Sequence, residues 1–154
     1  WRMLEIQAAI GRIQLRRMPA WTAARLRNAG RIWATARTCP ALRVPDIPQW
    51  AEHAAYKCYV FVEPHRLAPG WTRDKVLREI NDAGVPALAG SCSEIYLEKA
   101  FEATPWRPKV RLGTAQELGE TSMMFLVHPT LTDAEIDKTC AVLASVMSRA
   151  TKVD

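Results

Sequence analysis

Residues 56–62 have the sequence Tyr56-Lys57-Cys58-Tyr59-Val60-Phe61-Val62. The run is rich in aromatic and β-branched side chains, and it is too short to form a stable helix. We therefore predict a largely buried β-strand at the centre of a sheet. A central strand needs a partner strand on each side and helices that cover its apolar face.

On the carboxyl side of this strand, helical and strand patterns alternate. Thr72 is a helix-capping residue type, and Gly84 supplies the left-handed backbone that ends a helix. Short strands are predicted at 85–89 and 123–127, and Ser93 is expected to cap a short helical turn that runs to Phe101. The helix between Thr72 and Gly84 has its apolar positions at Val76, Leu77, Ile80 and Ala83.

Two later helix starts carry a reciprocal capping signature, a threonine with a glutamate three residues on. The pairs are Thr114 with Glu117 and Thr132 with Glu135. Because strands and helices alternate without a glycine-rich phosphate loop, the predicted fold class is α+β, with a small, mostly antiparallel sheet packed with helices. The inner face of the last helix is expected to consist of Ile136, Cys140, Leu143, Val146 and Met147.

On the amino side of the central strand, two long helices are predicted. Apolar residues at 3–18 form two helical stripes, and Pro19 is expected to end this helix at a tight corner before a second helix at 21–36. The proline-rich stretch that follows has no period and is interpreted as an extended surface connection. The expected organisation is a helical segment, a linker and an α+β domain at residues 1–38, 39–55 and 56–154.

Composition limits the classes of function. The chain has 154 residues, of which 49% are apolar, enough for one domain with a buried core. No apolar run approaches the roughly 20 residues of a membrane span, so we expect a soluble protein without a membrane partner. The net charge is +5, but no nucleic-acid recognition motif accompanies the arginines, and no nucleic-acid partner is expected. Trp1 opens the chain without an initiator methionine, and we expect a truncated amino terminus.

Cysteine and histidine residues are scattered. The four cysteines never form a CxxC pair, which favours reduced thiols and a cytoplasmic location. The three histidines share no ligand spacing, so no metal site is expected.

Four segments resemble one known family. The opening reads Arg2-Met3-Leu4-Glu5-Ile6-Gln7-Ala8-Ala9-Ile10-Gly11, followed by Gln14-Leu15. Together with residues 56–62, 73–85 and 127–136, it is similar to the DegT/DnrJ/StrS-type sugar aminotransferases, which have the fold-type-I architecture of the aspartate aminotransferases. The resemblance covers most of the chain in the right order. It implies that the chain is the carboxy-terminal small domain of such an enzyme.

The chain departs from the family pattern in the segment after Gly84. Where the family usually has a His-Tyr pair, this chain has Gly90 and Ser91, and Tyr96 stands where a second histidine would be. The resemblance implies substrate binding by Ser91, Cys92 and Tyr96, although a simple turn at Ser91 and Cys92 remains an alternative. It also implies contact of Arg2 with the cofactor phosphate, since a guanidinium matches phosphate geometry; a surface arginine is the alternative.

The resemblance further implies a function for a longer protein. It would be a homodimer that uses pyridoxal phosphate to transfer an amino group from an amino-acid donor to a nucleotide-linked keto sugar. No catalytic residue is assigned within this chain, because the lysine that binds the cofactor is expected upstream of Trp1, and the chain alone is expected to be inactive. The alternatives are a pyridoxal-phosphate-dependent sugar dehydratase of the same family and a non-catalytic interaction or regulatory module.

Overall fold

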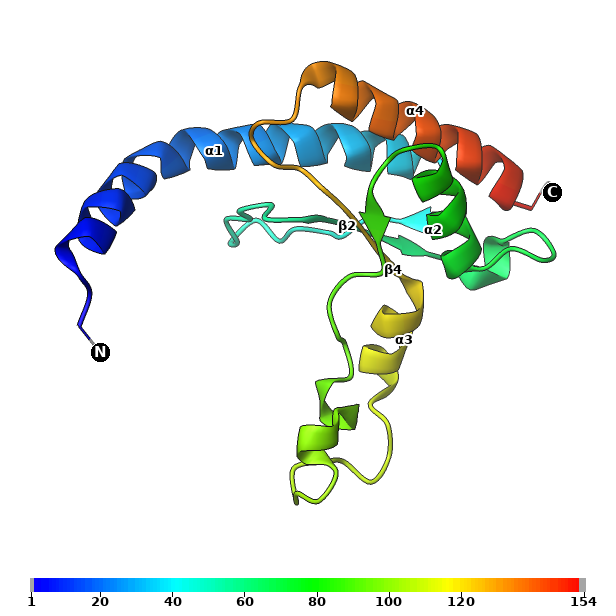
Figure 1. Cartoon of the computed structure of the whole chain (residues 1–154). Helices are drawn as coiled ribbons and strands as arrows, with labels where there is room; N and C mark the ends of the chain where they lie inside the picture. Colours follow the sequence, from blue (N-terminus) through cyan, green and yellow to red (C-terminus); the bar gives the residue numbers. More distant parts are fainter. Residues whose placement is uncertain (1, 153–154) are drawn as a thin grey trace.

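A four-stranded antiparallel sheet forms the centre of the computed structural model, which describes residues 2–152 (Figure 1). The strand order is β1-β2-β4-β3, and each neighbouring pair is antiparallel. The predicted α+β class is therefore confirmed, and the strand from the central run is interior to the sheet, as predicted. The strands are β1 Leu42–Arg43, β2 Cys58–Val62, β3 Ala87–Leu88 and β4 Ser122–Phe125.

The two faces of β2 have different surroundings. Cys58, Val60 and Val62 are buried, whereas Tyr59 and Phe61 are only half-buried. Successive side chains of a strand point to opposite faces, so the buried residues mark the face that the helices cover. Burial also raises the pKa of the Cys58 thiol to about 12, with a smaller contribution from nearby Cys140.

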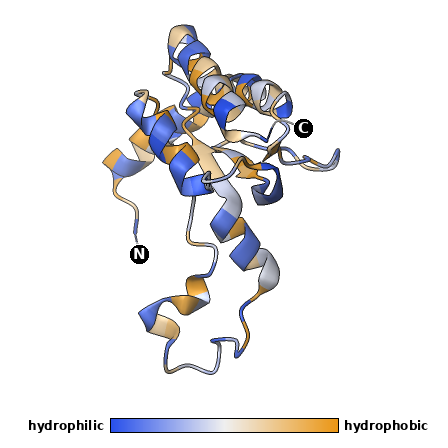
Figure 2. Cartoon of the chain, turned by 90° about the vertical axis from the view of Figure 1, so that its right-hand side faces the viewer, coloured by the Kyte–Doolittle hydropathy of each residue, from blue (hydrophilic) through white to orange (hydrophobic). Residues whose placement is uncertain are grey.

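Two helices contact the strands of the sheet on that face and a third packs across both of them, and the ribbons of these helices carry hydrophobic as well as hydrophilic residues (Figure 2). A fourth helix, α3, precedes β4 and lies beyond this layer (Figure 1). Residues from all three packing helices belong to one hydrophobic core with the inward residues of β2 and β4. The four helices are α1 Glu5–Arg37, α2 Arg73–Asp82, α3 Gly113–Thr121 and α4 Asp133–Ala150.

The prediction of two helices that meet at Pro19 was wrong, because α1 is a single helix of 33 residues with Pro19 inside it. A proline in a helix removes one backbone hydrogen bond and favours a bend. The flanking sequence is rich in alanine, leucine, arginine and glutamine, which are strong helix formers. The chain therefore continues as a helix, and α1 arches away from the sheet toward its amino end (Figure 1).

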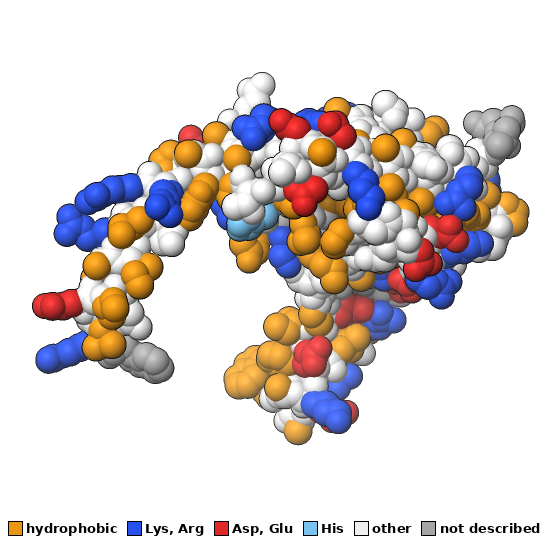
Figure 3. All heavy atoms as spheres, turned by 45° about the horizontal axis from the view of Figure 1, so that its top comes forward, with side chains coloured by type: hydrophobic (Ala, Val, Ile, Leu, Met, Phe, Trp, Pro, Cys, Tyr) orange, Lys and Arg blue, Asp and Glu red, His pale blue; other side chains and the backbone are white. Residues whose placement is uncertain are grey.

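Only the carboxy-terminal half of α1 is buried. Its buried residues all lie between Asn28 and Ala36. The amino-terminal half projects from the body of the protein with apolar side chains on its surface (Figure 3). Both stripes predicted from the sequence are thus exposed within this chain: Met3, Leu4, Ile6, Ile10, Ile13, Leu15 and Met18.

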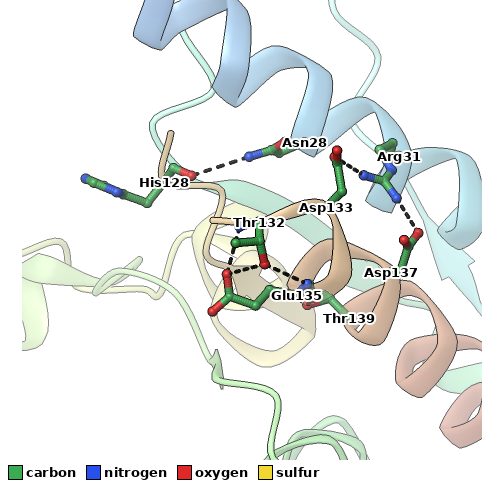
Figure 4. A network of polar contacts seen from close by, with 8 residues as sticks. All are labelled: Asn28, Arg31, His128, Thr132, Asp133, Glu135, Asp137 and Thr139. Atoms are coloured by element: carbon green, nitrogen blue, oxygen red, sulfur yellow. Dashed lines mark hydrogen bonds and ion pairs between the residues drawn. The ribbon is translucent and has the colours of Figure 1, made fainter. Parts of the chain in front are cut away.

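A polar clasp joins α1 to the start of α4 (Figure 4). The Asn28 amide is almost completely buried and donates to the His128 carbonyl at 3.3 Å. Arg31 donates to Asp133 at 2.8 Å and also contacts Asp137, one helical turn further along α4. Since both aspartates lie near the amino end of α4, they also interact favourably with its helix dipole.

The helix boundaries follow local capping chemistry. Thr72 accepts a hydrogen bond from the Lys75 amide at 3.2 Å, and Gly84 follows α2 with a φ of 76°, as predicted. The capping box of α4 is also confirmed, because Thr132 accepts from the Glu135 amide while the Glu135 carboxylate accepts from the Thr132 amide at 2.7 Å. These hydrogen bonds lower the pKa of Glu135.

The capping box predicted at Thr114 was wrong. Helix α3 begins at Gly113, and its N-cap is Leu112. The Leu112 amide donates to the Tyr96 hydroxyl at 2.9 Å, so a tertiary contact fixes the chain two residues before the predicted cap.

The sequence patterns also missed or overextended some short elements. Strand β1 lies within the stretch expected to be irregular, and its two residues pair with the end of β2. The helical turn expected to start at Ser93 consists instead of two 3-10 turns, η2 Ile95–Leu97 and η3 Lys99–Phe101, with Glu94 before the first of them. A further 3-10 turn, η1, spans Pro64–Arg66.

Residues 91–112 form a lobe that extends away from the sheet (Figure 1). An ion pair closes its base: Arg111 donates to Glu94 at 2.9 Å through Nε and makes a second contact through Nη2. The Tyr96 hydroxyl donates to the same carboxylate at 2.6 Å. The hydrogen bonds from Arg111, and secondarily from Tyr96, lower the pKa of Glu94 to about 2. The ion pair therefore joins the two ends of the lobe.

Replacing Thr132 with alanine should lower the free energy of unfolding by about 0.5–2 kcal/mol, because an amide in the first turn of α4 loses its partner. Thermal and denaturant melts of the 154-residue chain can measure the change. Thr114→Ala is the matched control, since Thr114 caps no helix, and it should cause no loss. Equal stability of the wild type and Thr132→Ala would contradict the role of the cap.

Replacing Arg111 with glutamine should raise the pKa of Glu94 from about 2 toward the ordinary glutamate range. A lowered carboxyl pKa stabilises the fold above the unfolded-state pKa, and that contribution is lost as the pH falls through the folded-state value. The variant should therefore lose it at higher pH than the wild type. Titration of the Glu94 carboxyl by NMR measures the shift.

Arg107→Gln is the control for this experiment, because Arg107 lies in the same lobe and its contact with Glu102 is long, at 4.0 Å. It should leave the Glu94 titration unchanged. If Glu94 titrates at the same pH in the wild type and in Arg111→Gln, the ion pair does not form in solution.

Candidate functional site

A hollow of about 570 Å³ lies where the lobe meets the sheet and α3. We call it the Ser91 hollow. Its floor is the turn that follows β3, and its walls come from the first half of the lobe and the end of α3. It is lined by Ala89, Gly90, Ser91, Cys92, Ser93, Glu94, Leu97, Glu98, Lys99, Gly119 and Glu120.

The turn at the floor depends on a glycine. Gly90 has a φ of 95°, a conformation that residues with a side chain rarely adopt. A Cβ at this position would lie 2.9 Å from Cε1 of Tyr59 and 3.1 Å from the Ser122 hydroxyl. The Ser122 hydroxyl in turn donates to the Ala89 carbonyl at 2.7 Å. Close approach at Gly90 therefore seats the turn against β2 and β4.

A second glycine, Gly119, leaves room for Ser93 at the other end of the turn. A Cβ at Gly119, near the end of α3, would collide with the hydroxyl of Ser93. The turn is thus packed between the sheet on one side and α3 on the other. This packing fixes the position of Ser91 and Cys92, which lie between the two contacts.

Ser91 and Cys92 are both exposed, and both line the hollow. The Ser91 hydroxyl lies 3.0 Å from the hydroxyl of Tyr59, which extends from the outward face of β2. The Cys92 thiol lies 3.5 Å from the Glu98 carboxylate. The structure therefore brings two of the predicted substrate-binding residues to one surface.

Tyr96 and Arg2 lie elsewhere. Tyr96 is buried and does not line the Ser91 hollow, and its hydroxyl already donates to Glu94 and accepts from Leu112. Arg2 is exposed, lies just ahead of α1 in the chain, and does not line the hollow. Trp1 falls outside the described residues.

The charge of the hollow is predominantly negative. Glu98 and Glu120 line it, with Lys99 as the single cation among its lining residues, while the charge of Glu94, which also lines it, is offset by the ion pair with Arg111. Carboxylates accept hydrogen bonds from hydroxyl or ammonium groups and repel phosphates. The hollow therefore does not fit the phosphate of pyridoxal phosphate, whereas the exposed guanidinium of Arg2 has the right chemistry for such a group.

Sequence patterns alone did not single out several of these residues. The contact of Tyr59 with Ser91 spans 32 residues of sequence, and the tyrosine was interpreted only as part of a buried strand. The sequence patterns did not assign Glu98 to a site. The sequence did single out the turn, because Gly90 and Ser91 stand where the resembled family usually has a His-Tyr pair. The left-handed backbone at Gly90 becomes evident only from the structure.

Two other classes of site are absent from the part of the chain that the structure describes. Among residues 2–152, no group of three His, Cys, Asp or Glu side chains is arranged to hold a metal ion. No helix in the same range combines the length and apolarity that a bilayer crossing requires.

Known structures share this fold. An aminotransferase from Psychrobacter cryohalolentis is 49% identical, with a TM-score of 0.91 over 96% of this chain and 40% of its own. The E. coli GDP-4-keto-6-deoxy-D-mannose-3-dehydratase with bound hydrated PLP is 22% identical, with a TM-score of 0.73 over 92% of this chain and 36% of its own. At 22% identity, the likeness to the dehydratase concerns the fold alone.

A curated relative and a family model match the sequence. The erythromycin biosynthesis sensory transduction protein EryC1 of Saccharopolyspora erythraea is 26% identical over 92% of this chain and 36% of its own length. The chain thus spans less than half the length of the relatives it matches. The model of the DegT/DnrJ/EryC1/StrS aminotransferase family matches residues 1–144. The chain belongs to the DegT/DnrJ/EryC1/StrS aminotransferase family.

Proposed function

We propose that this chain is the carboxy-terminal part of a pyridoxal-phosphate-dependent aminotransferase that acts on a nucleotide-linked keto sugar. The family match over residues 1–144 supports this proposal most directly, together with the 49% identity to the Psychrobacter cryohalolentis aminotransferase. The amino donor would be an amino acid, commonly glutamate in the resembled family. The location of the longer protein would be the cytoplasm.

The proposal gives the residues of this chain a binding role. Ser91 and Cys92 would contact the sugar at the hollow, and Tyr96 would support that surface through its contact with Glu94. Arg2 would bind the phosphate of the cofactor. Pyridoxal phosphate supplies an electron sink when it is bound, and the lysine that holds it would belong to the part of the longer protein outside this chain.

A sugar dehydratase is the second candidate, and one observation favours it. The E. coli structure named as a GDP-4-keto-6-deoxy-D-mannose-3-dehydratase with bound hydrated PLP has the same fold over most of this chain. Its reaction would retain the cofactor and the sugar class but remove a hydroxyl group instead of adding an amino group.

A non-catalytic module is the third candidate. The curated relative is named a sensory transduction protein, and it spans 92% of this chain. In that case the exposed surfaces of α1 and of the lobe would bind another protein.

The longer protein, loaded with pyridoxal phosphate, should transfer nitrogen from ¹⁵N-labelled glutamate to a nucleotide-linked keto sugar, which mass spectrometry detects. The 154-residue chain alone should be inactive and should give no saturable cofactor absorbance. Loss of a hydroxyl without gain of nitrogen would indicate the dehydratase. An intact protein that binds no cofactor would indicate the non-catalytic module.

The 154-residue chain should self-associate through the projecting half of α1, because its apolar stripes are exposed and large apolar patches rarely remain uncovered. A two-fold pair in which equivalent stripes meet is the simplest assembly, and the longer protein should be a homodimer as well. Sedimentation of the wild type beside a variant with Ile6→Gln and Ile10→Gln tests the expectation, and the variant should shift toward the monomer.

Leu126→Gln is the control, since Leu126 is an exposed apolar residue remote in sequence from α1. It should sediment like the wild type. A wild-type chain that stays monomeric at high concentration would mean that the neighbouring arginines keep the stripes in water.

A further inference from the structure

We propose that Tyr59 is a positioning residue, which holds the Ser91 hydroxyl at the hollow so that it binds a hydroxyl or carbonyl group on the sugar part of the substrate, and not its phosphates. This inference rests on the proposed function, which it extends from a substrate class to the part of the substrate that this surface recognises. Four features of the structure support it: the hydrogen-bonding capacity of the pair, its rigidity, its location and the surrounding charge.

The hydroxyls of Tyr59 and Ser91 lie 3.0 Å apart, and either can donate to the other. If Tyr59 donates, Ser91 keeps its own proton and a lone pair for a ligand. If Ser91 donates, it keeps an acceptor lone pair while Tyr59 keeps its proton. In both arrangements the pair has a donor and an acceptor left to offer. The two together suit a sugar hydroxyl, and the donor alone suits a carbonyl oxygen.

The pair is rigidly held. Tyr59 belongs to the interior strand, where it is paired with Met124 of β4, and its carbonyl accepts a hydrogen bond from the Trp33 indole at 3.0 Å. Ser91 follows Gly90, whose backbone could not approach Tyr59 so closely if it carried a side chain. A binding group on a rigid support pays little entropy when a ligand arrives.

The location leaves the Ser91 hydroxyl accessible to a ligand. Ser91 is exposed and lines the hollow, unlike Tyr96, whose hydroxyl is buried between two partners within the chain. Glu98 and Glu120, which only Lys99 offsets among the lining residues, disfavour phosphate and favour hydroxyl donors; Glu94 is already paired with Arg111. The sugar, and not the diphosphate, is therefore the part of a nucleotide sugar that suits this surface.

The test uses the cofactor-loaded, full-length protein and four forms of it: wild type, Tyr59→Phe, Ser91→Ala and the double variant. Uridine, thymidine and guanosine diphosphate hexoses are titrated by calorimetry, each beside its own nucleoside diphosphate. For the hexose compound that binds the wild type most tightly, each single variant should weaken binding by roughly three- to tenfold, the effect of one neutral hydrogen bond. Binding of the matching nucleoside diphosphate should not change.

The double variant separates positioning from independent contacts. If Tyr59 acts through Ser91, removing both hydroxyls should cost little more than removing one, because the two effects belong to one interaction. Tyr56→Phe and Ser145→Ala are the matched controls, since both residues are exposed and lie outside the hollow, and neither should alter binding.

Three results would overturn the inference. Unchanged affinity in both single variants would remove the role of the pair, and additive losses would mean that Tyr59 acts independently of Ser91. An equal loss for the nucleoside diphosphate would place phosphates at the hollow. The proposed function has its own test and is refuted if the wild type transfers no nitrogen to a nucleotide-linked keto sugar. A wild-type protein that binds none of the nucleotide sugars would refute the proposed function and this inference together.

Discussion

The alternation of side chains along β2 is the constraint on which both the core and the candidate site depend. Its buried residues, Cys58, Val60 and Val62, pack under α1, α2 and α4, and this burial fixes the register of the strand. A slip of one residue would send Tyr59 into the core and expose Val60. The same constraint that builds the core therefore holds the Tyr59 hydroxyl against Ser91, which lines the hollow.

The polar clasp between α1 and α4 fixes the position of the projecting helix relative to the core. Asn28 is buried with its amide bonded to the His128 carbonyl, and a buried polar group without such a partner would be costly. Arg31 adds two contacts to α4. Because the carboxy-terminal half of α1 is held in this way, the apolar amino-terminal half is presented as a helical arm in a defined direction. An arm of this kind is suited to packing against other protein surface.

Sequence patterns predicted most of the fold where local chemistry decides it. A short run of aromatic and β-branched residues identified β2, and capping residues identified the start of α2 and α4. The errors have different causes: helix α1 continues through Pro19 because strong helix formers flank it, and the hydroxyl of Tyr96 fixes the cap of α3 at Leu112 by a tertiary contact. Strand β1 has only two residues and exists through pairing with β2, so it had no period to detect.

The site was predictable only in part, and the reason lies in its glycines. Ser91 and Cys92 could be named because they depart from a family motif, but their support comes from residues far along the chain. Gly90 allows contact with Tyr59 and Ser122, and Gly119 allows contact with Ser93. Gly90 therefore does more than leave space in the turn. It permits a close approach of the turn to the phenol ring of Tyr59 on β2, and the contact between the two hydroxyls fixes the position of Ser91. A side chain at position 90 would have displaced the Ser91 hydroxyl.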